Sequence, residues 1–167
     1  HKSVKNSLLK LKAFFVHFEN QGKILADGNR NQIKVFDLEG TKVTVKRFKI
    51  PNLVNKIAYQ YFRKSKAQRS YEYACKLLDK GILTPFPLGY AIESNGIFFG
   101  KSFYACKLVE ADATFRTLIN EEDFPNRIEI LKAFTRFTYE MHEKQIHFLD
   151  HSAGNTLIVQ TEKGYDF

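Results

Sequence analysis

The stretch Leu149-Asp150-His151-Ser152-Ala153-Gly154-Asn155, followed by the apolar run Thr156-Leu157-Ile158-Val159, decides how this chain is interpreted. An Asp with an Asn five residues later, between a predicted long helix and a predicted short strand, is typical of a phosphoryl-transfer catalytic loop. In that chemistry the Asp accepts the proton of the attacking hydroxyl, and the Asn side chain holds a metal ion that bridges the phosphates. The same spacing also occurs in ordinary polar loops, where Asp and Asn favour turns.

The first quarter of the chain predicts a helix and an antiparallel sheet. Residues 4–18 carry apolar side chains three or four positions apart, with lysines between them, which indicates a basic amphipathic helix. Such a helix could lie on a membrane surface, although packing on its own domain is the commoner arrangement. Three alternating runs separated by turn residues, at 23–25, 32–36 and 42–48, then predict a three-stranded meander.

The rest of the chain mixes helices and strands. The predicted elements are a short helix over 54–62, a helix over 67–78 ending at Lys80-Gly81, a hairpin of 88–92 with 97–99 across Asn95-Gly96, a strand over 102–109 and a long helix from 124 to about 144. The polar stretch 110–113 separates the strands from the long helix. The fold class expected from this order is α+β, with an antiparallel sheet first and a helical part second.

Composition narrows the class of protein. The chain has 167 residues, of which 44% are hydrophobic and 14% aromatic, so it is expected to fold. It has no apolar run of the roughly 20 residues that a membrane-spanning helix needs, and no signal peptide is visible. Cys75 and Cys106 form no CxxC pair, and two buried free thiols in a reducing compartment are expected.

The net charge of +8 is concentrated in one stretch, 41–71, which contains no Asp or Glu. Its nine basic residues are Lys42, Lys46, Arg47, Lys49, Lys56, Arg63, Lys64, Lys66 and Arg69. Such a field attracts phosphates, whether on a nucleotide, a lipid head group or a nucleic acid. A solvated helix face that only aids solubility is the alternative.

Lys46 and Glu72 supply the context that the loop motif needs. Val43-Thr44-Val45-Lys46 has the V-A-I-K pattern, in which a strand lysine contacts nucleotide phosphates. Such a lysine needs a carboxylate from the following helix, and Glu72 is the only acidic residue between Glu39 and Asp79. With Asp150 and Asn155 downstream, the order of residues favours a kinase active site over a polar loop.

Two further motifs are less specific. Asp27-Gly28-Asn29-Arg30-Asn31 lies where a phosphate-covering loop between the first two strands is expected, although an ordinary hairpin turn explains it equally well. His142 and His147 are five residues apart, which places them about 140° apart on a helix and excludes a zinc-hydrolase pair.

Together these residues resemble the lipopolysaccharide kinase family, the Kdo/heptose kinases of the inner core, which has a protein-kinase-like fold. The resemblance runs from about Asp27 to the C-terminus. The most specific segments are Gly28-Asn29-Arg30-Asn31, Val45-Lys46-Arg47-Phe48, Ser65-Lys66-Ala67-Gln68-Arg69-Ser70, Leu77-Leu78-Asp79-Lys80-Gly81-Ile82-Leu83-Thr84-Pro85 and Asp150-His151-Ser152-Ala153-Gly154-Asn155.

The resemblance implies a role for each matching residue. Lys46 would contact the ATP phosphates and pair with Glu72, Asp150 would be the catalytic base, and Asn155 would bind Mg²⁺. The nucleotide-binding set would further include Gly28, Asn29 and Arg30 in the phosphate loop, and Lys107 and Val109 in a hinge over 107–112 beside adenine.

The reaction implied is transfer of the γ-phosphoryl group of ATP to a sugar hydroxyl of lipopolysaccharide inner core. The acceptor would be a lipid-linked anionic sugar met by a cytoplasmic protein at the inner face of the cytoplasmic membrane, and no nucleic-acid partner is expected. A nucleic-acid-binding module using the basic stretch is an alternative. An atypical protein kinase, a small-molecule kinase and a non-catalytic pseudokinase are others, the last because Phe148 stands where kinases usually carry His.

The domain organisation expected is an N-terminal helix at 1–20, a kinase-like small lobe at 21–110 and a partial large lobe at 111–167. A second metal-binding Asp is expected beyond Phe167, because Asp166 follows the turn at 162–164 too closely. The sequence is therefore expected to be a fragment with little or no activity by itself.

Overall fold

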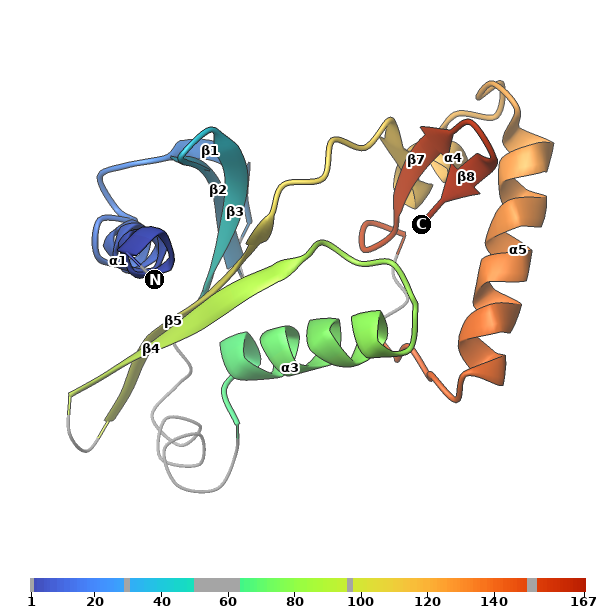
Figure 1. The fold of residues 1–167 in the computed structure, drawn as a ribbon. Coiled ribbons are helices and arrows are strands. Elements are labelled where there is room, and N and C mark those ends of the chain that lie inside the picture. The colour runs from blue at the N-terminus through green and yellow to red at the C-terminus, as the bar shows by residue number, and fades with distance from the viewer. Residues whose placement is uncertain (1, 29–30, 50–63, 96–97, 150–152) are drawn as a thin grey trace. The chain divides into compact units, whose positions relative to one another are not determined.

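The computed structural model describes residues 2–28, 31–49, 64–95, 98–149 and 153–167 (Figure 1). The chain forms two compact units. Unit 1 contains His1–Lys76 and Pro85–Leu108, and unit 2 contains Leu77–Thr84 and Val109–Phe167. Each unit has its own hydrophobic core.

Unit 1 contains an antiparallel sheet with the strand order β1-β2-β3-β5-β4. The strands are β1 (Lys23–Asp27), β2 (Asn31–Leu38), β3 (Thr41–Phe48), β4 (Pro87–Asn95) and β5 (Phe98–Lys107). The predicted meander is therefore present as β1 to β3. The separate strands predicted at 97–99 and 102–109 were wrong, because β5 is one continuous strand. A Cβ at Gly100 would lie 2.8 Å from the Glu93 carbonyl oxygen, so glycine allows β4 and β5 to stay paired there.

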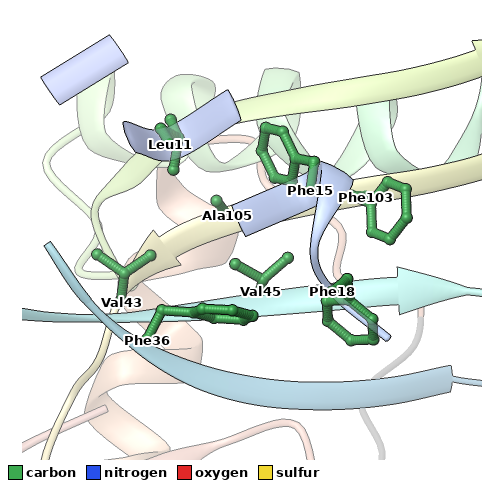
Figure 2. Packing of buried hydrophobic residues seen from close by; sticks show 8 residues of the cluster. All are labelled: Leu11, Phe15, Phe18, Phe36, Val43, Val45, Phe103 and Ala105. Atoms are coloured by element: carbon green, nitrogen blue, oxygen red, sulfur yellow. The ribbon is translucent and has the colours of Figure 1, made fainter. Parts of the chain in front are cut away.

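Helix α1 (Lys2–Val16) covers one face of this sheet. Leu11 and Phe15 of α1, with Phe18 just after it, pack on side chains from the strands (Figure 2). The strand residues of this cluster are Phe36, Val43, Val45, Phe103 and Ala105. Phe18 is completely buried and lies 5.5 Å, centroid to centroid, from Phe103. The amphipathic stripe read from residues 4–18 thus packs on the protein's own sheet.

A buried lysine fixes the end of α1 to the sheet. Lys34 of β2 is only 6% exposed, and its ammonium group donates to the backbone carbonyls of Phe18, Glu19 and Gln21 at 2.6, 3.1 and 3.1 Å. The carbonyl groups after a helix otherwise lack partners, so Lys34 satisfies three of them at once. A buried charge is tolerated here because it is fully hydrogen-bonded.

Helix α3 (Lys66–Asp79) follows the predicted boundaries closely. It begins where the Ser65 hydroxyl accepts a 3.0 Å hydrogen bond from the Gln68 backbone N–H, which is an N-cap contact. It ends at Gly81, whose φ of +68° permits the Ile82 N–H to reach the Leu77 carbonyl at 2.9 Å. The short helix predicted over 54–62 lies outside the described residues.

Unit 2 contains two helices and a three-stranded antiparallel sheet of order β6-β7-β8. The elements are β6 (Ala113–Thr114), α4 (Phe115–Asn120), α5 (Arg127–Glu143), β7 (Leu157–Thr161) and β8 (Gly164–Asp166). The buried core is formed by Ala113, Leu118, Ile130 and Ile158. The sequence did not predict α4, although Thr114 and Thr117 form a capping box at its start. In the part of the chain that the structure describes, no helix has the length and apolar character that a bilayer crossing requires.

Candidate active site

Lys46 lies on the face of the sheet that α1 does not cover. Val43 and Val45 of β3 are completely buried in the core beneath α1, and successive side chains of a strand point to opposite faces. Lys46 therefore faces away from α1. Its register partners are Ile33 on β2 and Tyr104 on β5, and its Nζ lies 5.4 Å from the ring centroid of Phe48. The predicted phosphate-binding lysine is thus held by the third strand between two neighbours.

The surroundings of Lys46 on this face are polar and aromatic. The Thr44 hydroxyl lies 3.0 Å from the Cys106 Sγ, and burial raises the pKa of the Cys106 thiol. Burial also raises the pKa of the Tyr104 hydroxyl, with the neighbouring Cys106 contributing. Both groups are therefore neutral at pH 7. Cys75 and Cys106 are free thiols, as predicted, although each is only half-buried.

Glu72 of α3 belongs to a small polar network. Its carboxylate accepts hydrogen bonds from Lys64 Nζ at 2.8 and 2.9 Å and from Gln68 Nε2 at 3.0 Å. The Lys64 hydrogen bond, followed by that of Gln68, holds the pKa of Glu72 below its usual value. Pairing of Glu72 with Lys46 stays a prediction, and it would occur in competition with Lys64.

The predicted phosphate loop begins at a tight turn between β1 and β2. The Gly28 N–H donates to the Asn31 carbonyl at 3.0 Å, and Gln32 Nε2 donates to Asp27 Oδ2 at 3.1 Å. These two contacts close the base of the hairpin. Asn29 and Arg30, the other two predicted contacts with phosphate, lie outside the described residues.

The predicted hinge connects the two units. Unit 1 ends at Leu108 and unit 2 resumes at Val109, within the 107–112 segment proposed to flank adenine. The N–H of Lys107 donates to the Phe86 carbonyl and that of Leu108 to the Lys42 carbonyl, both at 2.9 Å. These two donors are already committed, so adenine-binding donors in the hinge would have to come from Val109 onward.

In unit 2 the segment after the hinge is tied to the predicted catalytic loop. Asp112 receives a 2.7 Å hydrogen bond from the Gln160 N–H, and the Phe115 N–H donates to the Thr156 carbonyl at 3.0 Å. The solvent-exposed Asn155 directly precedes Thr156, two residues before β7 begins. Asp150, the predicted base, lies outside the described residues. Among the residues that are described, no group of three His, Cys, Asp or Glu side chains forms a metal site.

Arg116 is a charged residue beside this loop that the sequence analysis missed. Its N–H donates to the Ala153 carbonyl at 2.9 Å, and its guanidinium lies directly over Gly154. A Cβ added to Gly154 would lie 3.2 Å from Arg116 Nη2 and 3.5 Å from Nε. Glycine thus lets an exposed guanidinium lie flat against the loop that contains Asn155.

Asp166 is part of the return strand, as expected. It pairs with Val159 across β7 and β8, and Phe167 packs on Phe134 and Phe137 with centroid distances of 5.3 and 5.4 Å. Asp166 and Phe167 also line a cavity of about 370 Å³ in unit 2, between α5, β8 and residues 81–83. Asp166 thus lies within a strand, and a metal-binding Asp beyond Phe167 stays a prediction.

These features define the class of fold. An antiparallel sheet with a lysine on its third strand and a helix after it, joined by a short link to a helical unit with a polar loop and a β-hairpin, is protein-kinase-like. The predicted α+β, protein-kinase-like fold is therefore confirmed.

One comparison with a solved structure supports this class of fold. The structure is similar to that of WaaP in complex with acyl carrier protein, with a TM-score of 0.50 and 15% sequence identity. The match covers 78% of this chain and 50% of the WaaP chain, so the chain spans about half the length of that protein. The aminoglycoside phosphotransferase APH(4)-Ia matches 68% of this chain and 32% of its own, at 14% identity and a TM-score of 0.30. No protein-family model and no curated protein sequence matches the chain.

Proposed function

We propose that this chain is the N-terminal half of a kinase catalytic domain that phosphorylates a sugar hydroxyl of lipopolysaccharide inner core, on Kdo or heptose, with ATP as donor. The observation that carries the proposal is the position of Lys46. It lies on the third strand, on the sheet face away from α1, in a fold shared with a lipopolysaccharide core kinase. A strand lysine in this place is the phosphate-contacting residue of protein-kinase-like enzymes.

The proposed mechanism assigns one task to each residue. Lys46 would bind the nucleotide phosphates, with Glu72 fixing its position, and the turn at Gly28 would bring Asn29 and Arg30 over the phosphates. Asp150 would accept the proton of the sugar hydroxyl as that oxygen bonds to the γ-phosphorus and the bond from phosphorus to ADP breaks. Asn155 would be one ligand of Mg²⁺, which supplies charge neutralisation on the phosphates when bound.

The position of Arg116 supports the proposal that the acceptor is anionic. A guanidinium recognises carboxylate and phosphate oxygens through paired hydrogen bonds, and both groups occur on lipid-linked inner-core sugars. Because Arg116 touches Gly154, one residue before Asn155, an anion bound to it would lie beside the reacting groups. A lipid-linked acceptor also implies that the protein works peripherally at the inner face of the cytoplasmic membrane. The WaaP complex makes an acyl carrier protein a further candidate partner.

The decisive test is nucleotide binding by variants of β3, measured by calorimetry with ATP and Mg²⁺. Lys46→Ala should weaken ATP binding by about 10- to 100-fold, the cost of losing one charged hydrogen bond. The matched control is Lys42→Ala, an exposed lysine on the same strand, which should leave ATP affinity unchanged. Equal ATP affinity in the Lys46→Ala variant and the wild type would contradict the proposal.

A second measurement separates catalysis from binding alone. In the natural full-length protein, Asp150→Ala should abolish phosphate transfer from ATP to purified lipopolysaccharide core while preserving ATP binding. Transfer that persists in Asp150→Ala would reject the mechanism. Binding without transfer in the wild type would instead favour a pseudokinase, for which Phe148 is the motivating residue. Transfer to a protein or a small molecule, but not to lipopolysaccharide, would keep the kinase and replace the acceptor.

A further inference from the structure

Helix α1 has apolar side chains on two sides, and the core uses only one of them. Leu11 and Phe15 are buried against the sheet. Leu8, Leu9 and Val16 are 53%, 56% and 72% exposed. Single exposed aliphatic side chains are common on protein surfaces, but three on one helix form an apolar patch, which indicates a binding surface.

Helical geometry places these three side chains together. At about 100° per residue, Leu8, Lys12, Val16 and Leu9 fall within one arc of roughly 100°, which begins beside the arc that holds Leu11 and Phe15 and extends away from it. Lys12 is also exposed and lies in the middle of this arc. We call Leu8, Leu9, Lys12 and Val16 the outer face of α1.

The helix is fixed on the sheet, so its inner residues are not available to a partner. Its N-terminal part is held by Ser7 and Lys10, whose side chains bind the Glu39 carboxylate at 3.0 and 2.9 Å. Its C-terminal end is held by the Lys34 ammonium and by the burial of Phe18. A rotation that exposed the inner residues would break all of these contacts.

The charges around the helix favour an anionic partner. The sequence of α1 contains four lysines and no acidic residue. The nearest acidic side chains are already paired, Glu39 with Lys10 and Glu19 with Arg47 and Lys101. These partners lower the pKa of both carboxyl groups, so the groups are ionised but compensated at pH 7. An approaching anion therefore meets the exposed Lys12, while Glu39 and Glu19 are already neutralised by their partners.

We propose that the outer face of α1 binds an anionic phospholipid surface, with Leu8, Leu9 and Val16 entering the head-group region and Lys12 contacting lipid phosphates. Aliphatic side chains interleaved with lysine suit such a fluid surface. Protein-binding hot spots are instead enriched in Trp, Tyr and Arg, and the outer face has none of these. The binding does not depend on phosphoryl transfer, and it would deliver the chain to the membrane where the proposed acceptor resides.

The test is co-sedimentation of the full chain with vesicles, without nucleotide. Vesicles of phosphatidylcholine with 30% phosphatidylglycerol, on the order of the anionic content used to probe such electrostatic contacts, are compared with pure phosphatidylcholine. The chain should bind the anionic vesicles, and binding should fall as salt rises. Leu9→Asp combined with Val16→Asp should lower the partition coefficient at least about fivefold, because apolar insertion is lost and negative charge is added.

Two controls keep the result interpretable. Ile128→Asp adds the same charge at a 62% exposed isoleucine of α5 and should leave vesicle binding unchanged. Circular dichroism and thermal melting should show that all variants fold, since the replaced side chains lie outside the core. Absence of binding to anionic vesicles, or equal binding of wild type and the Leu9→Asp, Val16→Asp variant, would overturn the proposal. Either outcome leaves the kinase proposal intact, because ATP binding is measured separately.

Discussion

The two faces of the five-stranded sheet differ completely in chemistry, although the same strands build both. One face carries Val43, Val45 and Phe103 and is sealed by α1. The other carries Thr44, Lys46, Tyr104 and Cys106, with a hydroxyl, an ammonium, a phenol and a thiol on neighbouring strands. Alternate residues of β3 thus serve the core and the candidate site in turn.

The comparison shows that neighbouring residues of one strand have different tasks: one stabilises the core and the next faces the candidate site. A slip of one position would place Lys46 beneath α1 and Val45 in the candidate site. The sealed face prevents such a slip, because its phenylalanines fit only one register. The following predictions test whether the two faces are as independent as their composition indicates.

The largest loss of stability is expected from a substitution in the core beneath α1. Phe103→Ala removes a ring that is 1% exposed and that contacts both Phe15 and Phe18. It should lower the free energy of unfolding by about 3–5 kcal/mol, measured by urea denaturation. A loss below about 1 kcal/mol would show that α1 does not seal this face.

The next effect concerns Lys34, a buried charge on the sealed face. Lys34→Met keeps the length of the side chain but leaves three carbonyl groups without the ammonium. The free energy of unfolding should fall by about 2–3 kcal/mol. Lys42→Met on the adjacent strand, where the lysine is exposed, should change it by no more than about 0.5 kcal/mol. Equal effects of the two substitutions would contradict the anchoring role of Lys34.

The free energy of unfolding should depend on pH through the face of the sheet that carries Lys46, Tyr104 and Cys106, which we call the open face. Burial raises the pKa of Tyr104 and of Cys106, so the folded chain keeps these protons at pH values where the unfolded chain loses them. Their stabilisation is complete below about pH 8.5 and is lost as the pH rises through the folded values. Denaturation between pH 8 and 11 should therefore show falling stability. Tyr104→Phe should make this fall shallower, whereas Tyr139→Phe, at a 65% exposed tyrosine, should not.

The smallest stability effect is expected at the residue with the largest proposed functional effect. Lys46→Met keeps the aliphatic part that lies near the Phe48 ring and should change the free energy of unfolding by less than about 1 kcal/mol. The same substitution should weaken ATP binding by about 10- to 100-fold, because it removes the same ammonium group as Lys46→Ala. A large loss of stability would mean that Lys46 belongs to the structural face and that the comparison fails.

Most of the fold could be predicted because periodicity reports burial directly. The stripe in residues 4–18, the alternation in β2 and β3 and the spacing in α5 each follow from one buried face. The continuity of β5 was missed because Gly100 looks like a turn residue in sequence, whereas a close approach of backbone requires it in the structure. Helix α4 was missed because six residues are too few to show a period.

The candidate site could be predicted only in part, since a motif locates residues but not their contacts. The strand pattern located Lys46, and its place on the open face follows from the register. The ion pair of Lys64 with Glu72 was not foreseen, because Lys64 was considered only as part of the basic stretch 41–71 and Glu72 only as a partner of Lys46. Arg116 carries no motif at all, and only the close approach of Gly154 reveals it.

The way α1 is covered has a consequence for biosynthesis. This helix leaves the ribosome before the strands do, but its buried side packs on Phe103 and Ala105 of β5 as well as on the early strands. At typical translation rates of about 5–20 residues per second, Leu11, Phe15 and Phe18 stay uncovered for several seconds until β5 emerges. The nascent chain thus exposes this apolar segment to chaperones, or to a nearby bilayer, well before the strands that bury it have been synthesised.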